Sequence, residues 1–178
     1  MKTAYFMTTQ RLGFRTWQLA DLQLAMDLWG DFKVTRLFDG RGPLSQAQVQ
    51  DRLHREIQSQ TNHGIQYWPL FHRGTGDHIG CAGLRPYDPT KGIFEMGIHI
   101  KSDHWRHGYA TEAARAVMDH AFDTLSAKAL FAGHNPRNTG SRQLLLKMGF
   151  QYTHDEFYEP TGLDHPSYLF HRDQRPTD

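Results

Sequence analysis

The fold is decided by residues 94–111, which read FEMGIHIKSDHWRHGYAT. Apolar residues alternate through the first seven positions with a second row made of Glu95, Gly97 and His99. Because successive side chains of a strand point to opposite faces, this pattern predicts a strand that carries Glu95 and His99 on one face. After a glycine-containing basic loop, small and apolar residues recur at three- and four-residue steps, which predicts a helix running to about Ser126.

The loop between this strand and this helix has the composition of an anion-binding site. A helix start exposes backbone N–H groups without partners and the positive end of the helix dipole. Gly108 lets a ligand approach the backbone, Arg106 and His107 add positive charge, and the small Ala110 leaves the first helical turn open. The sequence therefore predicts that a phosphate or pyrophosphate binds here without a metal.

Two familiar phosphate-binding motifs do not fit the chain. No glycine-rich loop ends in Gly-Lys-Ser or Gly-Lys-Thr, so a nucleoside-triphosphate P-loop is absent. Residues 74–76 (GTG) lack a third glycine three positions on, and they predict a hairpin turn rather than a dinucleotide-binding loop.

A second group of polar residues follows a short apolar segment. Residues 129–133 (ALFAG) predict a buried strand, residues 134–139 a loop, and residues 141–148 a helix that Gly149 ends. Asn138 and Ser141 stand at the start of this helix, where either side chain is also a good helix cap.

These ordered segments resemble the GNAT superfamily of acetyl-coenzyme-A-dependent N-acetyltransferases, and more narrowly the branch with the ribosomal-protein N-terminal acetyltransferases. The resemblance rests on EMGIHI at 95–100, WRHGYATEA at 105–113, Asn138 with Ser141, and LLKMGF at 145–150. Residues 11–17 (RLGFRTW) with Asp21, and residues 79–84 (IGCAGL), stand where that branch has its first and third strands. The resemblance spans nearly the whole chain.

The resemblance implies a donor site for acetyl-CoA. The loop Trp105–Thr111 would bind the pyrophosphate of coenzyme A through Arg106, His107, Gly108, Tyr109, Ala110 and Thr111. The pantetheine arm would lie where the 94–100 strand splays from the 129–133 strand, against His99 and the backbone of Ile98 and Ile100. Asn138 would bind the donor near its thioester. His99 departs from the family pattern, where an aromatic residue is common, and His107 stands where Lys, Gln or Arg is common.

Direct attack of an amine on a thioester requires a base that accepts a proton from the amine, and a group that donates a proton or a hydrogen bond to the leaving thiolate. Glu95 is the first candidate base, directly or through a water, with His99 and His134 as alternatives; an ordinary ion pair with Arg or Lys is the other interpretation of Glu95. Ser141 is the candidate that protonates or positions the thiol, and Tyr152 and Tyr158 compete for this role.

The remaining segments predict the scaffold. Helices are expected at 21–29 and from a Ser45/Gln48 capping box to about Gln60, and strands at 65–72, 78–84 and 93–100, then near 150–153 and 167–171. The expected order is β-α-α-β-β-β-α-β-α-β-β. This is an α/β fold with a mixed sheet, splayed between its fourth and fifth strands and covered by helices on both faces, in one domain over residues 1–178.

Composition excludes several other classes. The net charge is +1 and the basic residues are dispersed, so the chain is not a dedicated nucleic-acid binder. The single cysteine, Cys81, lies in an apolar strand and is expected to be buried rather than nucleophilic. No signal peptide or membrane-spanning segment is seen, and the twelve histidines show no metal-ligand spacing, so we expect a cytoplasmic, metal-free protein, monomeric or homodimeric.

Residues 156–166 are aromatic and acidic, and we expect a loop that closes over the acceptor. Its carboxylates would favour a cationic amine, and Trp17, Trp68 and Tyr158 would supply apolar walls, unless these groups are only solvated or packed on the sheet. The acceptor is a protein N-terminus or a small-molecule amine. A non-catalytic acyl-CoA sensor and an RNA- or ribosome-associated phosphate binder are the alternative functions.

Overall fold

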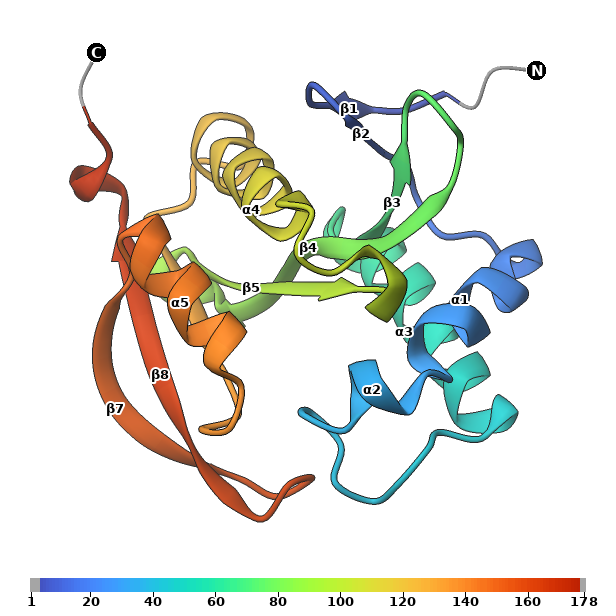
Figure 1. The fold of residues 1–178 in the computed structure, drawn as a ribbon. Helices are drawn as coiled ribbons and strands as arrows, with labels where there is room; N and C mark the ends of the chain where they lie inside the picture. The colour runs from blue at the N-terminus through green and yellow to red at the C-terminus, as the bar shows by residue number, and fades with distance from the viewer. Residues whose placement is uncertain (1–3, 177–178) are drawn as a thin grey trace.

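The computed structural model describes residues 4–176, which form one eight-stranded mixed sheet with helices on both faces (Figure 1). The elements in chain order are β1 (Met7–Thr8), β2 (Leu12–Phe14), α1 (Leu22–Trp29), α2 (Phe32–Thr35), α3 (Gln46–His63), β3 (Tyr67–His72), β4 (His78–Asp88), β5 (Ile93–Ile100), α4 (Tyr109–Asp119), β6 (Ala129–Gly133), α5 (Thr139–Met148), β7 (Gln151–Tyr158) and β8 (Leu163–His171). Short 3-10 turns cover Leu19–Asp21, Pro89–Lys91, Ser102–His104 and Arg172–Gln174, and a π turn at His120–Thr124 extends α4. The predicted fold class is confirmed.

The strand order is β1-β2-β3-β4-β5-β6-β8-β7. Among the described strands only the β5–β6 pair is parallel, because α4 carries the chain back across the sheet between them. The predicted antiparallel run of β3, β4 and β5 is confirmed.

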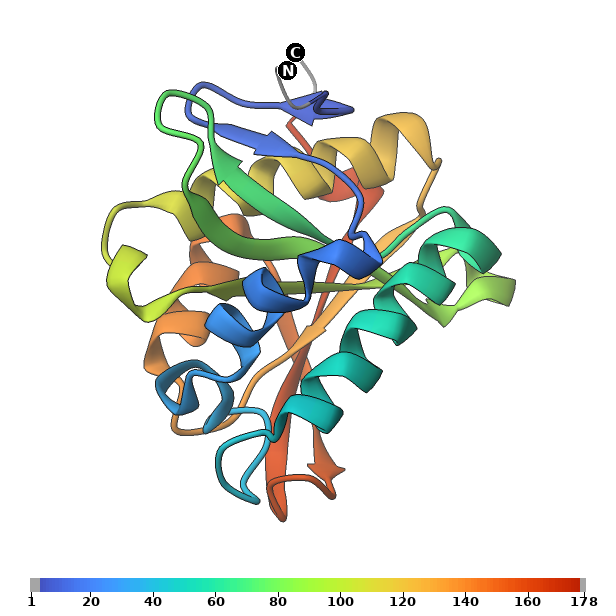
Figure 2. The same ribbon diagram turned by 90° about the vertical axis from the view of Figure 1, so that its right-hand side faces the viewer.

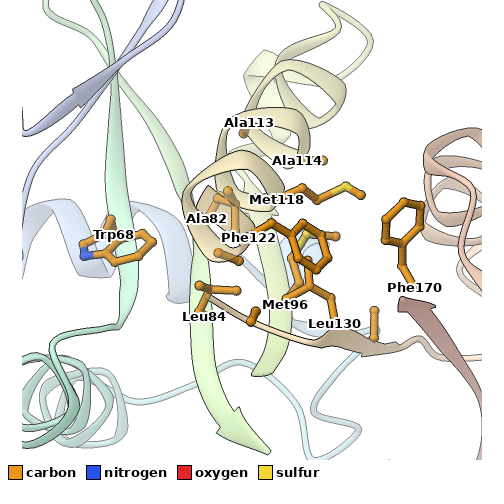
Figure 3. Packing of buried hydrophobic residues seen from close by; sticks show 14 of the residues in the cluster. Trp68, Ala82, Leu84, Met96, Ala113, Ala114, Met118, Phe122, Leu130 and Phe170 are labelled. Carbon is orange, nitrogen blue, oxygen red and sulfur yellow. The ribbon is translucent and has the colours of Figure 1, made fainter. Parts of the chain in front are cut away.

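One apolar core lies between the sheet and α4 (Figure 3). Ala113, Ala114, Val117 and Phe122 are fully buried along the inner face of α4 and its π turn, and the alternating row of β5 meets them through Met96. A second core lies on the opposite face, under α1 and α3. These two helices stand in front of the sheet in Figure 2. The two faces of β5 therefore meet different helices.

The helix caps explain most of the boundaries. The predicted capping box of Ser45 and Gln48 opens α3, and this helix runs three residues beyond the expected end because Gly64 supplies the left-handed residue (φ 70°) that terminates it. Gly149 (φ 89°) ends α5 as predicted. Two short elements, β1 and α2, were not predicted, since neither is long enough to show a period.

The C-terminal segment corrects the prediction of a long loop at residues 156–166. The chain forms a hairpin in which β7 and β8 pair from Gln151↔Leu169 to Tyr158↔Leu163, and the turn at Glu159–Gly162 is closed by Gly162 (φ 68°). All eight residues of β7 are exposed, so this edge strand lacks the alternation that identifies a half-buried strand. Trp17 and Trp68 are buried, at 3% and 1% exposure, and cannot form walls of an acceptor pocket as expected.

Candidate functional site

The sheet opens between β5 and β6. These strands pair only from Ile93↔Ala129 to Glu95↔Phe131, and beyond Glu95 the edge of β5 has no strand beside it in the described chain. The Lys101 N–H donates to the Ile79 carbonyl (2.9 Å), so the backbone groups at this position point toward β4. By alternation, the backbone groups of Met96, Ile98 and Ile100 point to the open side.

The open edge of β5 is already occupied at its last residue. The indole N–H of Trp105 donates to the Ile100 carbonyl over 2.8 Å. Ile98 therefore offers both its N–H and its C=O to a strand-like ligand. Ile100 offers only its N–H, so of the two backbone groups expected to pair with the pantetheine arm at Ile100, one is already bonded.

The loop before α4 has the form of an anion cradle. Arg106 (φ 64°) and Gly108 (φ 79°) adopt left-handed conformations, and Gly108 is the N-cap without a side-chain hydrogen bond. The first intrahelical bond runs from the Glu112 N–H to the Gly108 carbonyl (3.1 Å). The N–H groups of Tyr109, Ala110 and Thr111 precede it at the bare helix start, so the residues present fit a pyrophosphate.

Arg11, from the turn before β2, holds this loop in place. Its Nη1 donates to the His107 carbonyl (2.9 Å), its Nε to Glu112 Oε2 (2.7 Å), and its guanidinium carbon lies 4.6 Å from the centre of the Tyr109 ring. The His107 ring is held by the Trp105 carbonyl (2.8 Å) and stacks on Tyr109. Sequence reasoning placed Arg11 only in the first strand, because its contacts lie about a hundred residues away.

Glu95 lies on β5 at the last residue that pairs with β6. The Tyr67 hydroxyl donates to Glu95 Oε1 over 3.0 Å, and no lysine or arginine of residues 4–176 lies within ion-pair distance of Glu95. The alternative interpretation of Glu95 as an ordinary ion-pair partner is thus unsupported in the described chain. Burial raises the pKa of Tyr67 well above its usual value, and the Glu95 charge adds to this, so Tyr67 keeps the proton that it donates.

Gly97 explains how Tyr67 reaches Glu95. A Cβ on Gly97 would come within 2.2 Å of the Tyr67 ring and 2.4 Å of its hydroxyl, so the ring crosses the strand at the one residue without a side chain. A glycine inside a strand often marks such a close approach. This was the signal in the sequence that could have identified Tyr67.

His99 lies on the same face as Glu95 but does not have the geometry of a base. Its Nδ1 accepts from the Trp29 indole N–H (3.2 Å), and the ring stacks on Phe38 with centres 4.5 Å apart. Burial, followed by the charges of Arg52 and Arg85, lowers the pKa of His99 well below its usual value. A neutral ring whose Nδ1 accepts from Trp29 carries its proton on Nε2.

An ion pair between half-buried Arg85 and buried Glu56 flanks Tyr67. Arg85 bonds Glu56, which is 1% exposed and also accepts from the Tyr67 N–H over 2.8 Å. The Arg85 guanidinium lies 4.1 Å from the centre of the Tyr67 ring. This pair fixes the ring that positions Glu95.

His134 lies on the other face of the sheet, because the alternation of β6 places Leu130, Ala132 and His134 toward α4 and α5. It is buried, and both ring nitrogens have neighbours: Nδ1 lies 2.8 Å from the Asn135 carbonyl and Nε2 lies 3.2 Å from the Tyr168 hydroxyl. The geometry does not support His134 as a base for the chemistry beside Glu95.

At the start of α5 the capping interpretation of Asn138 is confirmed. Its Oδ1 accepts from the Ser141 N–H over 3.0 Å. The Asn138 amide nitrogen and the Ser141 hydroxyl have no protein partner in the described chain. Both groups therefore stay free to form hydrogen bonds with a ligand at the start of this helix.

Tyr152 and Tyr158 lie on the exposed hairpin strand β7, at 56% and 41% exposure. The tip of this hairpin meets the loop between α2 and α3, where the Gly40 N–H donates to the Pro160 carbonyl over 3.0 Å (Figures 1 and 2). Cys81 is fully buried as predicted, and burial raises the pKa of its thiol.

Among residues 4–176 no group of three His, Cys, Asp or Glu side chains gathers as a metal site requires. The helices within this range are too short or too polar to span a membrane.

An open strand edge beside a bare helix start, with a carboxylate at the point of divergence, fits the site of an acyl-coenzyme-A transferase. The acetyltransferase (GNAT) domain matches residues 11–151, and the chain belongs to this family. It is an N-acetyltransferase whose acyl donor is acetyl-CoA, as the sequence predicted.

Curated relatives agree with this assignment. The uncharacterized N-acetyltransferase p20 of Bacillus licheniformis is 28% identical over 155 residues, which cover 85% of this chain and 83% of p20. The uncharacterized N-acetyltransferase YoaA of Bacillus subtilis (strain 168) is 35% identical over 92 residues, 52% of this chain and 51% of YoaA.

Solved structures share the fold. A GNAT-family acetyltransferase from Bacillus anthracis superposes with a TM-score of 0.80 at 19% identity, covering 94% of this chain and 99% of that one. RimL, a ribosomal L7/L12 alpha-N-protein acetyltransferase in complex with coenzyme A, gives a TM-score of 0.79 at 13% identity and covers 94% and 97% of the two chains.

Proposed function

We propose that this N-acetyltransferase acetylates a primary amine by direct attack of the amine on the thioester, with Glu95 as the base. The observation that carries the proposal is the Glu95 carboxylate, which Tyr67 holds through one oxygen at the residue where β5 parts from β6. The second oxygen has no protein partner in the described chain. It is available to an amine, or to a water that relays the proton.

The backbone of β5 would hold and polarise the donor. Ile98 offers a free N–H and C=O on the open edge, and Ile100 offers an N–H, so a pantetheine amide can pair there as an added strand. A backbone N–H at this edge also stabilises the oxyanion that forms as the amine attacks the thioester carbonyl.

The start of α5 would serve the leaving group. As the new C–N bond forms and the C–S bond breaks, negative charge develops on sulfur, and the proton lost by the amine goes to Glu95. The Ser141 hydroxyl, in the first turn of α5, would donate to the thiolate or position it, with the helix dipole stabilising the charge. The Asn138 amide would bind the donor beside it.

The acceptor is a protein N-terminus or a small-molecule amine, and RimL offers a precedent for the first. The fold described above acts, in this proposal, as one catalytic domain. Its cytoplasmic location and its monomeric or homodimeric state stay predictions of the sequence.

The test begins with calorimetric titration of the protein with acetyl-CoA, followed by thiol release with a panel of amines and short peptides. Glu95→Gln removes the proton acceptor but keeps the shape, so we expect turnover to fall by about 100-fold or more at unchanged acetyl-CoA affinity. Asp51→Asn, which removes an exposed carboxylate on α3, is the matched control and should keep full activity. Turnover of Glu95→Gln within twofold of the control would exclude Glu95 as the base.

A further inference from the structure

Arg52, on α3, is a cation that the reaction described above does not use. Its guanidinium carbon lies 4.7 Å from the centre of the Trp29 ring and 5.1 Å from that of Phe38. These two residues are also the neighbours of His99, through the Trp29 hydrogen bond and the Phe38 stack. We call these four residues, Trp29, Phe38, Arg52 and His99, the Arg52 site.

Arg52 has no anionic partner within residues 4–176. Its Nε is buried without a hydrogen bond, and no carboxylate of the described chain lies within ion-pair distance of its guanidinium. Burial, followed by the nearby charge of Arg85, lowers the pKa of Arg52. Arg52 still keeps its proton at neutral pH, because the guanidinium group of arginine stays protonated in proteins. A half-buried cation with a buried, unbonded Nε and no anion beside it is costly to maintain.

The two nearby carboxylates are bound elsewhere. Glu56, one helical turn after Arg52, is bonded by Arg85 and by the Tyr67 N–H. Asp39 accepts from the Arg41 side chain at 2.8 and 2.6 Å and from its backbone N–H at 3.1 Å. Both acids thus bond other donors, and within the described residues Arg52 has no acidic partner.

The Arg52 site lies on the acceptor side of the sheet. His99 shares its face of β5 with Glu95 and stands four residues further on, about 13 Å along the strand. Phe38, Arg52 and His99 are half-buried, so part of each stays at the surface, whereas Trp29 is fully buried.

From these contacts we infer that Arg52 binds a carboxylate of the acceptor, so that the substrate is a primary amine that also carries a carboxylate group. The planar guanidinium donates two parallel hydrogen bonds to a carboxylate, and His99 Nε2–H adds a donor on the same side. The inference rests on the proposed function, since it names the acceptor class for the same site.

The experiment measures thiol release with matched pairs of acceptors that differ only in a carboxylate and its carboxamide. One pair is L-leucine and L-leucinamide, a second is ε-aminocaproate and its amide, and a third is the tripeptide amide Ala-Glu-Ala against Ala-Gln-Ala. We expect the carboxylate member of at least one pair to have a kcat/KM at least about tenfold higher. The pair that shows the preference tells whether a free amino acid, a longer amino acid or an acidic peptide supplies the carboxylate.

Arg52→Gln should remove this preference by raising KM for the carboxylate acceptor at least about tenfold, with little change for the carboxamide or for acetyl-CoA affinity. Arg52→Lys, which keeps the charge and loses the paired geometry, should give an intermediate KM. Arg55→Gln is the matched control, because it removes the exposed charge of an arginine that lies three residues further along α3.

The outcomes separate the two proposals. Amines that are acetylated with no carboxylate preference in any pair would overturn the role of Arg52 and leave the proposed function standing. Failure to acetylate any amine would instead count against the proposed function. If Arg52→Gln does not fold, the wild-type pairs and Arg52→Lys decide alone; a purely structural Arg52 predicts no preference in either.

Discussion

At the scale of single residues, the central relation is between Glu95, Tyr67 and Gly97. The strand pattern placed Glu95 on the face of β5 that it occupies, but the hydroxyl that holds it comes from β3, across β4. Gly97 leaves the space through which the Tyr67 ring passes. A base held on one oxygen keeps its orientation before the substrate arrives, which is the physical requirement for efficient proton transfer.

Tyr67→Phe tests this relation. The substitution removes only the hydroxyl and keeps the aromatic contacts with Arg85 and His99. Since a hydrogen bond to a charged group is worth about 1.5–3 kcal/mol, we expect kcat to fall by about tenfold or more while acetyl-CoA affinity stays unchanged.

Steady-state kinetics with a fixed amine, together with calorimetry of acetyl-CoA binding, would measure both quantities. Tyr5→Phe, which removes a hydroxyl from an aromatic ring stacked on Phe71 of β3, serves as the control. A Tyr67→Phe protein with wild-type kcat would show that Tyr67 only packs against the strand.

At the scale of elements, the proposed pyrophosphate site at the start of α4 depends on the backbone of Gly108. Gly108 is the left-handed N-cap of this helix, so the N–H groups of the first turn have no intrahelical partner, and Arg11 donates to the His107 carbonyl of the same loop. A Cβ at Gly108 would meet Arg11 only at 3.4 Å, an ordinary contact, so a side chain fits the space and strains the backbone instead.

Gly108→Val should therefore weaken acetyl-CoA binding at least about tenfold, because a β-branched residue disfavours the left-handed conformation and shifts the N–H groups away from the pyrophosphate. Gly76→Val is a matched control, since Gly76 has nearly the same φ (81°) in the β3–β4 turn, with open space around it.

Both variants should lose about 1–2 kcal/mol of stability from backbone strain. Calorimetric titration with acetyl-CoA separates them, because only the Gly108 variant should lose affinity. Equal affinities for the two variants would refute the placement of the pyrophosphate at this loop.

At the scale of the whole molecule, burial of histidines makes folding depend on pH. His78, 6% exposed, packs between Trp17 and Phe71, and burial, followed by the Lys101 charge, lowers its pKa to about 4. Arg15 adds to this effect and Asp21 opposes it. The folded protein keeps His78 neutral where an unfolded chain takes up a proton, near the ordinary value of 6.5.

The sign of the effect follows from this difference. Because the pKa of His78 is lower in the folded than in the unfolded protein, stability is complete above about pH 6.5 and falls as the pH falls. Between about pH 6.5 and 4, protonation linked to His78 should lower the free energy of unfolding by up to about 3 kcal/mol. His78→Phe, which fills the same aromatic site, should remove this part of the acid sensitivity.

Urea unfolding at a series of pH values measures the effect as a difference between wild type and variant. The exposed His54→Phe is the control and should follow the wild-type curve. Wild-type and His78→Phe curves that run parallel from pH 7.5 to 4.5 would disprove this role for His78.

Elements whose sequence signal acts over a few neighbouring residues were predicted best. Strand β6 was predicted with its observed bounds, and β5 and α5 to within a residue or two, because period, caps and glycine stops act within one helical turn or a few strand positions. The β7–β8 hairpin was missed in length, since an edge strand that buries nothing has no hydrophobic period to recognise.

The amino-acid sequence by itself determined the order of the longer elements, the loop and helix start that form α4, and the position of Glu95 on the open strand. Only the tertiary structure decided what surrounds them: Arg11 on a loop 96 residues away, Tyr67 bonded to Glu95 across 28 residues, and Arg52 without an acidic partner among residues 4–176. Local backbone preferences are set by neighbours along the chain. Contacts between distant segments depend instead on how helices and strands pack, and packing has no local signature in the sequence.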